Sequence, residues 1–223
     1  MFVVKSIPRR FDTSVAARFT EVETASLGHI MDYGFLEPAI ASISGNARVC
    51  GAAFTVSLPG DDGTALSHAL TLVQKGDVLV IERVGDTRPA CWGAVTTAAA
   101  CAAGIAGVVL DGFITDLSAI RASNLPLWAR GTSPITTKLR GQGGRIGTVI
   151  ACGNVVVTPG ALVLADENGV CILPDEGLDA LLEAALALQE QEPSIIQQIR
   201  EGVKLGDING ASALIGQSMI QLR

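Results

Sequence analysis

One continuous stretch, residues 92–116, constrains the fold more than any other part of the chain. It reads WGAVTTAAACAAGIAGVVLDGFITD: a turn, a helix of very small residues, a glycine break, an apolar strand and a loop. The pattern predicts a helix over 92–103 and a buried strand over 105–110. Asp111 and Asp116 follow the strand. Because a helix start suits an anion and strand-end carboxylates suit a hard cation, the stretch predicts a crevice for a chelating 2-oxo acid.

The rest of the chain mixes short apolar strands with helices, without a strict strand–helix–strand alternation. Further strands are expected at 47–57, 77–82, 125–129, 149–152, 155–157, 161–165 and 170–173. Further helices are expected at 66–74, 117–123 and 175–191, with Pro193 interrupting the last and Ser194 capping another to about residue 204. This order predicts an α/β fold with a mixed sheet and flanking helices. At 223 residues, a single domain, 1–223, with a helical C-terminal extension over 176–223 is expected.

Composition excludes several classes of protein. The net charge is −6 and no run of Lys or Arg occurs, which argues against a nucleic-acid partner. No apolar run has the length of a membrane span, and the N-terminus lacks the pattern of a signal peptide. The five cysteines form no C-x-x-C pair, which favours reduced thiols over a disulfide framework or a zinc site. We therefore expect a cytoplasmic protein without a membrane partner.

The start of the predicted helix is the candidate anion site. Its backbone N–H groups, at Gly93, Ala94, Val95 and Thr96, would form a cradle at the positive end of the helix dipole. The pattern is weaker than a glycine-rich phosphate loop, because no G-x-G-x-x-G or G-K-[ST] motif is present. The alternative is that Gly93 only permits close packing of the helix on the strand.

Asp116 is the candidate metal ligand, and it has a competing explanation. It directly precedes the predicted helix at 117–123, so its side chain could instead serve as the N-cap. Asp111 stands before a glycine and could form an Asx-turn. The residues alone leave both alternatives open.

Five segments, taken together, resemble the family of 4-hydroxy-4-methyl-2-oxoglutarate aldolases and their RraA-like relatives, which include ribonuclease-activity regulators once misnamed menaquinone methyltransferases. The matching segments are GAAFTVSLPGDD (51–62), GDVLVIE (76–82), the stretch 92–116, LPLWARG (125–131) and VVVTPGALVLADENGVCILP (155–174). They occur in the family's order and place the core of the RraA-like domain at about residues 20–180.

The resemblance implies a swivelling β/β/α domain that assembles as a homotrimer or as a hexamer of two trimers, with sites between subunits. It also implies a divalent metal, Mg²⁺ or Mn²⁺, that holds a pyruvate-type 2-oxo acid. The family's metal-holding aspartate falls on Asp116, and its loop for the substrate carboxylate falls on Gly93 to Thr96.

The chain departs from the aldolase pattern next to this aspartate. Family aldolases carry an arginine immediately before it, where this chain has Thr115, and an acid three residues after it, where this chain has Ala119. Thr115 and Asp116 are the expected catalytic pair, with Thr115 also touching substrate. Threonine carries no charge to stabilise an enolate. Another arginine could take that place, and the candidates are Arg88, Arg121 and Arg130.

Two hypotheses for the function follow. The first is a metal-dependent lyase of the aldolase or oxaloacetate decarboxylase type that acts on a 2-oxo acid, with protons handled by metal-bound water or by Glu190 or Glu192 of a neighbouring subunit. The second is a non-catalytic regulatory or binding protein on the same scaffold. A mean hydropathy of +0.42 is high for a monomer, so a homo-oligomer is expected in either case.

Overall fold

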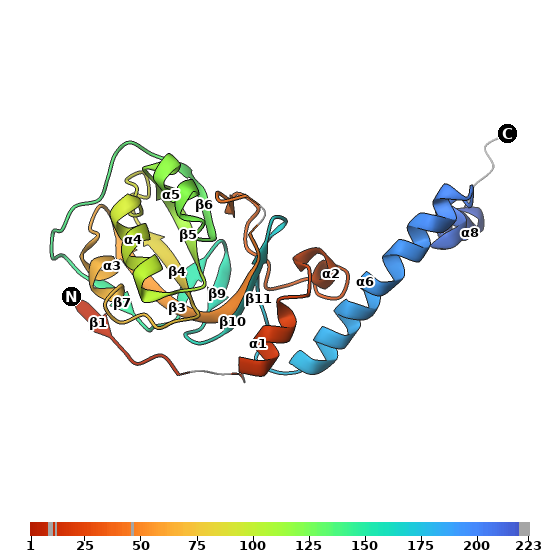
Figure 1. Cartoon of the computed structure of the whole chain (residues 1–223), viewed down its shortest axis with the longest axis horizontal. Helices are drawn as coiled ribbons and strands as arrows, with labels where there is room; N and C mark the ends of the chain where they lie inside the picture. The colour runs from red at the N-terminus through yellow and green to blue at the C-terminus, as the bar shows by residue number, and fades with distance from the viewer. Residues whose placement is uncertain (9–10, 12, 46, 219–223) are drawn as a thin grey trace.

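A nine-stranded mixed sheet forms the centre of the molecule (Figure 1). The computed structural model describes residues 1–8, 11, 13–45 and 47–218. The middle of the sheet is four parallel strands in sequence order: β3 (Val49–Pro59), β4 (Asp77–Val84), β5 (Gly107–Ile114) and β6 (Leu127–Thr132). Most residues of β3, β4 and β5 are buried, so these strands carry mainly apolar side chains on both faces.

Short strands extend the sheet on both sides. β7 pairs with β3 and β1, β2 pairs with β6, and β10 pairs with β3 and β11. Their bounds are β1 (Phe2–Val4), β2 (Ala41–Ser42), β7 (Gly144–Ile146), β10 (Leu162–Asp166) and β11 (Gly169–Ile172). The predicted turn at 166–169 is confirmed as the β10–β11 hairpin.

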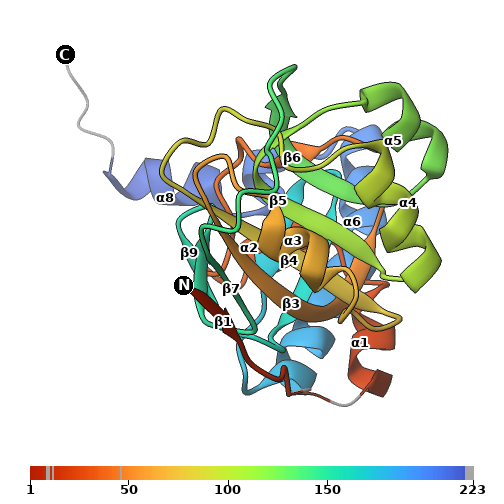
Figure 2. The same cartoon turned by 90° about the vertical axis from the view of Figure 1, so that its left-hand side faces the viewer.

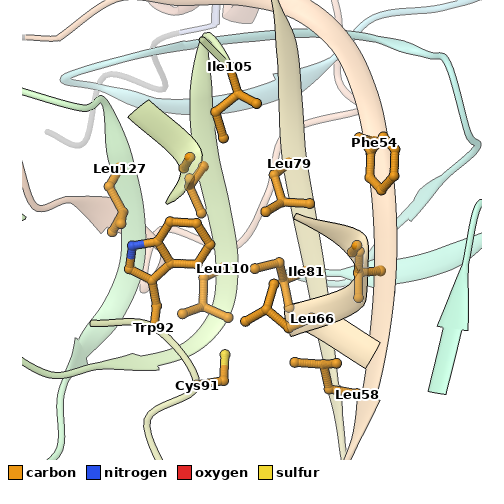
Figure 3. Close-up of a cluster of buried hydrophobic side chains, with 14 of the residues drawn as sticks. Phe54, Leu58, Leu66, Leu79, Ile81, Cys91, Trp92, Ile105, Leu110 and Leu127 are labelled. Atoms are coloured by element: carbon orange, nitrogen blue, oxygen red, sulfur yellow. The ribbon is translucent and has the colours of Figure 1, made fainter. Parts of the chain in front are cut away.

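Three helices cover one face of the parallel strands, as Figure 2 shows: α3 (Thr64–Ala69), α4 (Ala94–Ala103) and α5 (Leu117–Ser123). Leu79 and Ile81 of β4 point into the core beneath these helices (Figure 3). Val78 and Val80 point to the opposite face, which the hairpin of β8 (Ile150–Cys152) and β9 (Val155–Val157) covers. The layers are therefore helix, sheet and sheet, and the predicted mixed α/β fold is confirmed.

The N-terminal helices and the start of the C-terminal helix share a separate small core over β10 and β11. These helices are α1 (Thr13–Phe19), α2 (Thr24–Gly28) and α6 (Leu178–Arg200). Beyond this core α6 runs away from the sheet and carries α7 (Leu205–Ile208) and α8 (Ala211–Ser218) at its far end (Figure 1). We call the segment from the start of α6 to the end of α8, residues 178–218, the C-terminal arm.

The predicted interruption at Pro193 is wrong, and so is the cap at Ser194. Helix α6 continues through both residues for 23 residues. Pro193 is exposed, so the backbone carbonyl that loses its helical partner can face water, and most neighbouring residues are strong helix formers. No helix among the described residues has both the length and the apolar character that a membrane span requires.

Candidate functional site

The segment that leads into α4 runs beside the end of β5. Trp92 pairs with Ile114 in a parallel bridge, and the backbone N–H of Thr115 donates to the carbonyl of Trp92 at 2.8 Å. A further bond joins the N–H of Cys91 to the carbonyl of Phe113 at 3.2 Å. These contacts place the first turn of α4 directly against the loop that follows β5.

Asp116 turns its carboxylate toward α4 and away from α5. Its Oδ2 accepts a hydrogen bond from the backbone N–H of Ala94 at 2.9 Å, and its side chain makes no capping bond to α5. The backbone of Asp116 is left-handed, with φ 53° and ψ 41°. A non-glycine residue in this region carries a conformational cost of about 1 kcal/mol or more. The Asp116 side chain therefore does not act as the N-cap of α5 and is directed to the start of α4 instead.

Gly93 is required by the close approach of these two elements. A Cβ atom at this position would lie 2.6 Å from Asp116 Oδ2 and 2.9 Å from Thr115 Cγ2. Both contacts are shorter than van der Waals distance, so any side chain would push Asp116 away from the helix start. Gly93 therefore permits the close approach of α4 to Thr115 and Asp116. Its role is not limited to the packing of the helix on the strand.

The four N–H groups of the predicted cradle lie at the start of α4, and two of them already have partners within the protein. The N–H of Gly93 donates to Thr96 Oγ1 at 2.9 Å, and the N–H of Ala94 donates to Asp116. The N–H groups of Val95 and Thr96 have no acceptor among the described residues, so the first turn can offer them to a ligand. The side chain of Val95 is 84% exposed, and Asp116 is exposed as well, so the junction lies open at the surface.

The donor set fits a hydrated magnesium ion better than a closed protein cage. No group of three or more metal-binding side chains occurs among the described residues. Asp116 Oδ1 takes part in no hydrogen bond within that part of the chain, while Oδ2 is anchored by Ala94. Mg²⁺ usually retains several waters and is held by one or two carboxylates together with its substrate. One anchored, exposed carboxylate is compatible with that mode of binding.

Three arginines were candidates to replace the arginine that family aldolases carry at the position of Thr115. All three bond to other groups. Arg88 forms a two-point ion pair with Asp86, and it holds the pKa of Asp86 down at about 2. Arg121 donates to the carbonyl of Ile43 at 3.2 Å. Arg130 forms ion pairs with two carboxylates on the other face of the sheet. Among the described residues, none of these three arginines forms a hydrogen bond with Thr115.

Asp111 is one of the two carboxylates on Arg130, so the structure separates it from Asp116. Its Oδ1 contacts Arg130 Nε at 2.5 Å and its Oδ2 accepts from the N–H of Gly153 at 2.8 Å. Glu37 completes the cluster at 2.7 Å from Arg130 Nη2. The Asx-turn interpretation is therefore wrong: Asp111 lies inside β5 and ties it to β6 and to the β8–β9 turn.

Arg83 is a buried cation that the sequence reasoning missed. Only 7% of it is exposed, and its Nε and Nη1 have no hydrogen-bond partner among the described residues. Its Nη2 donates to the backbone carbonyl of Gly60. Burial raises the pKa of the neighbouring Cys91, and the charge of Arg83 opposes that rise. Its position two residues after Ile81, in the alternating pattern of β4, was the signal that it points inward.

Replacing Arg83 with methionine is expected to stabilise the protein. Arg83 forms no ion pair among the described residues, and a buried guanidinium of this kind costs desolvation energy that an apolar side chain of similar length avoids. We expect Arg83→Met to raise the free energy of unfolding by about 1–2 kcal/mol in urea denaturation. A loss of stability of that size would contradict the assignment of Arg83 as an unpaired charge.

Comparison with known proteins identifies the family. A family model described as "RraA-like: Aldolase/RraA" matches residues 24–172. A protein of Halalkalibacterium halodurans named "Putative 4-hydroxy-4-methyl-2-oxoglutarate aldolase" is 32% identical over 187 residues, covering 83% of this chain and 89% of that protein. The chain belongs to the RraA-like family.

Solved structures agree with this assignment. The crystal structure of an uncharacterized protein from Pseudomonas syringae pv. tomato has a TM-score of 0.78 at 27% identity, covering 95% of this chain and 99% of that one. Streptomyces coelicolor RraAS2, described as "an unusual member of the RNase ES inhibitor RraA protein family", has a TM-score of 0.73 at 27% identity. The alignment with RraAS2 covers 84% of this chain and 98% of that protein. The family thus includes proteins named as aldolases and proteins named as inhibitors.

Proposed function

We propose that this chain is a divalent-metal-dependent lyase that acts on a 2-oxo acid, by retro-aldol cleavage or decarboxylation. The observation that carries the proposal is the position of Asp116, whose carboxylate lies against the first turn of α4 and does not cap α5. The Halalkalibacterium halodurans relative named as an aldolase supports the same class of reaction. The substrate class is that of 4-hydroxy-4-methyl-2-oxoglutarate and oxaloacetate, which both yield pyruvate.

In this proposal Asp116 holds Mg²⁺ or Mn²⁺ through Oδ1, while Ala94 fixes Oδ2. The ion, when bound, supplies a Lewis acid that polarises the 2-oxo group. The N–H groups of Val95 and Thr96 bind the substrate carboxylate at the positive end of α4. Thr115 lies beside Gly93 and offers a hydroxyl group without a charge.

A non-catalytic regulatory function is the second candidate, and Thr115 is the observation that favours it. No arginine side chain reaches this junction among the interactions of the described residues, and Streptomyces coelicolor RraAS2 is described as belonging to an inhibitor family. A screen for pyruvate release from a panel of 2-oxo acids with Mg²⁺ or Mn²⁺ separates the two. Ion-dependent release supports the lyase, and a folded protein without release on the whole panel supports the regulator.

Placing a positively charged side chain next to Asp116 is expected to raise the rate of pyruvate formation. Thr115→Arg should increase kcat/KM for pyruvate formation about tenfold at saturating Mg²⁺, which is near the effect of one hydrogen bond to a developing charge. The gain is partial because Ala119 provides no nearby acid to anchor the new guanidinium. Thr115→Lys separates the effect of charge from that of the guanidinium geometry. A fast wild-type enzyme that the substitution slows would show that another group already supplies the charge.

We also propose that the chain forms a homo-oligomer and that the C-terminal arm contributes to its interface. The arm extends from the body and exposes a series of apolar side chains: Leu188, Ile196, Ile199, Val203, Leu205, Leu214 and Ile215. A concentration of exposed apolar side chains on one extended element is typical of subunit contacts. Glu190 and Glu192 lie on the same arm, so within such an assembly they are candidates to reach the site of another copy.

The expected assembly is a trimer or hexamer, measured by light scattering at micromolar concentration. Ile196→Asp combined with Ile199→Asp should shift the protein to smaller species, because each substitution buries a charge if the interface forms. Gln198→Asp is the matched control, since it adds a charge to the same turn without removing an apolar side chain. A wild-type monomer, or equal effects of both changes, would contradict the proposed role of the arm.

A further inference from the structure

The Gly93–Ala94 peptide group has a fixed orientation that depends on a buried indole. The carbonyl of Gly93 accepts three hydrogen bonds from inside α4: from Thr96 Oγ1 at 2.9 Å, from Thr97 Oγ1 at 2.8 Å and from Thr97 N at 3.0 Å. Because a trans peptide is planar, with its N–H opposite its C=O, these bonds direct the N–H of Ala94 away from the helix. That N–H is the donor that holds Asp116.

The hydroxyl of Thr97 is itself held by Trp92. The indole Nε1 of Trp92 donates to Thr97 Oγ1 at 2.8 Å, so the single hydroxyl proton of Thr97 is left to donate to Gly93. Both side chains are buried, with Trp92 1% and Thr97 2% exposed, so water does not compete for these bonds. The result is a chain of three groups: indole N–H, threonine hydroxyl and glycine carbonyl.

Trp92 also fixes the other half of the junction. Its backbone carbonyl accepts from the N–H of Thr115 at 2.8 Å, next to Asp116. Its ring lies in the core cluster with Leu110 of β5 and Leu127 of β6 (Figure 3). One residue thus connects the helix start, the loop that carries the carboxylate and the sheet beneath them.

We propose that Trp92 and Thr97 are positioning residues that aim the Ala94 N–H at the Asp116 carboxylate and thereby set its geometry for a divalent ion. The hydrogen bonds of the two side chains lead to the Gly93 carbonyl and not to Asp116, so both act through the Gly93–Ala94 peptide. The inference about the ion rests on the proposed function, whereas the orientation of the peptide rests on the hydrogen bonds alone. The two parts therefore need separate measurements.

The first measurement is amide hydrogen exchange of Ala94 by NMR, in the absence of metal and substrate. Thr97→Val keeps the shape of the side chain and removes the hydroxyl, and Trp92→Phe keeps a ring and removes the indole donor. Both should raise the exchange rate of the Ala94 N–H about tenfold, corresponding to one hydrogen bond. Thr97→Ser keeps the hydroxyl and should restore the wild-type rate. Wild-type exchange in both folded variants would overturn the proposal.

The second measurement is the dissociation constant of Mn²⁺ by calorimetry. Thr97→Val and Trp92→Phe should each weaken binding about tenfold, and the double variant should be no weaker than Thr97→Val, because both changes break one chain of bonds. Trp128→Phe is the matched control: it removes the other tryptophan, whose indole bonds to the carbonyl of Asp166 outside the junction. Additive losses, or an equal loss in Trp128→Phe, would overturn the positioning role.

These outcomes remain distinguishable from failure of the proposed function. If the wild-type protein binds no Mn²⁺ while Ala94 exchange responds as expected, the metal site fails and the orientation of the peptide stands. If Mn²⁺ binds to all variants equally and exchange is also unchanged, the metal site stands and the positioning role fails. Circular dichroism of each variant confirms that a loss of binding does not come from unfolding.

Discussion

Asp116→Ala is expected to weaken the binding of Mg²⁺ and Mn²⁺ at least about a hundredfold, because loss of a direct ligand exceeds the usual effect of losing a supporting contact. Asp116 is the only carboxylate at the junction among the described side-chain contacts, so no neighbour takes its place. Calorimetry with Mn²⁺ measures the effect. Pyruvate formation, if the lyase proposal holds, should fall in parallel.

Two further variants test whether the loss of metal binding comes from the charge of the Asp116 carboxylate. Asp116→Asn keeps the size of the side chain and an oxygen acceptor for Ala94 but removes the charge, and it should also lose the ion. Asp32→Ala removes an exposed acid outside the junction and should bind as the wild type does. Unchanged affinity in both Asp116 variants would show that this carboxylate only stabilises the start of α4.

Asp62→Ala is expected to cause the largest loss of stability. Asp62 is fully buried and accepts hydrogen bonds from the hydroxyl of Thr64 at 2.5 Å and from the backbone N–H groups of Thr64, Arg140 and Gln142. It therefore fixes the loop before β7 to the end of β3. Removing the carboxylate leaves four partly buried donors without their acceptor, which should cost about 3 kcal/mol in urea denaturation at neutral pH.

The same carboxylate predicts a sensitivity to acid. Burial raises the pKa of Asp62, but the hydrogen bonds from Thr64, Arg140 and Gln142 outweigh it and hold the pKa well below its usual range. The stabilisation is therefore complete above the unfolded value of about 4 and is lost as the pH falls below it. Asp62→Asn should flatten this acid-side decline in the free energy of unfolding. An equally steep decline in the variant would assign the acid sensitivity to other groups.

The central layers of the fold could be predicted because local patterns specify them. Helix α5 occupies the predicted residues 117–123, and β4 and β5 follow from apolar runs that are buried on both faces. The short strands β1 and β7 were not predicted. Each has three residues, and Phe2 pairs with Gly144 far along the chain, so no local pattern specifies them.

In the candidate site, too, features set by neighbouring residues could be predicted, whereas features set by contacts between distant segments could not. The helix start at Gly93 and the position of Asp116 after β5 could be inferred from sequence. The direction of the Asp116 carboxylate could not, because it depends on contact between two segments that are 22 residues apart. The burial of Arg83 was also missed, because a charged residue is normally expected at the surface. Only the alternation of inward and outward side chains along β4 indicates that Arg83 points inward.

The most direct test of the proposed site is the binding of oxalate, a planar dianion that resembles the enolate of pyruvate, measured by calorimetry with and without Mg²⁺. We predict that oxalate binds the wild-type protein only when Mg²⁺ is present, and that Asp116→Ala abolishes this binding. Oxalate binding that is independent of Mg²⁺, or that persists in Asp116→Ala, would contradict a metal-dependent 2-oxo acid site at the junction of α4 and β5.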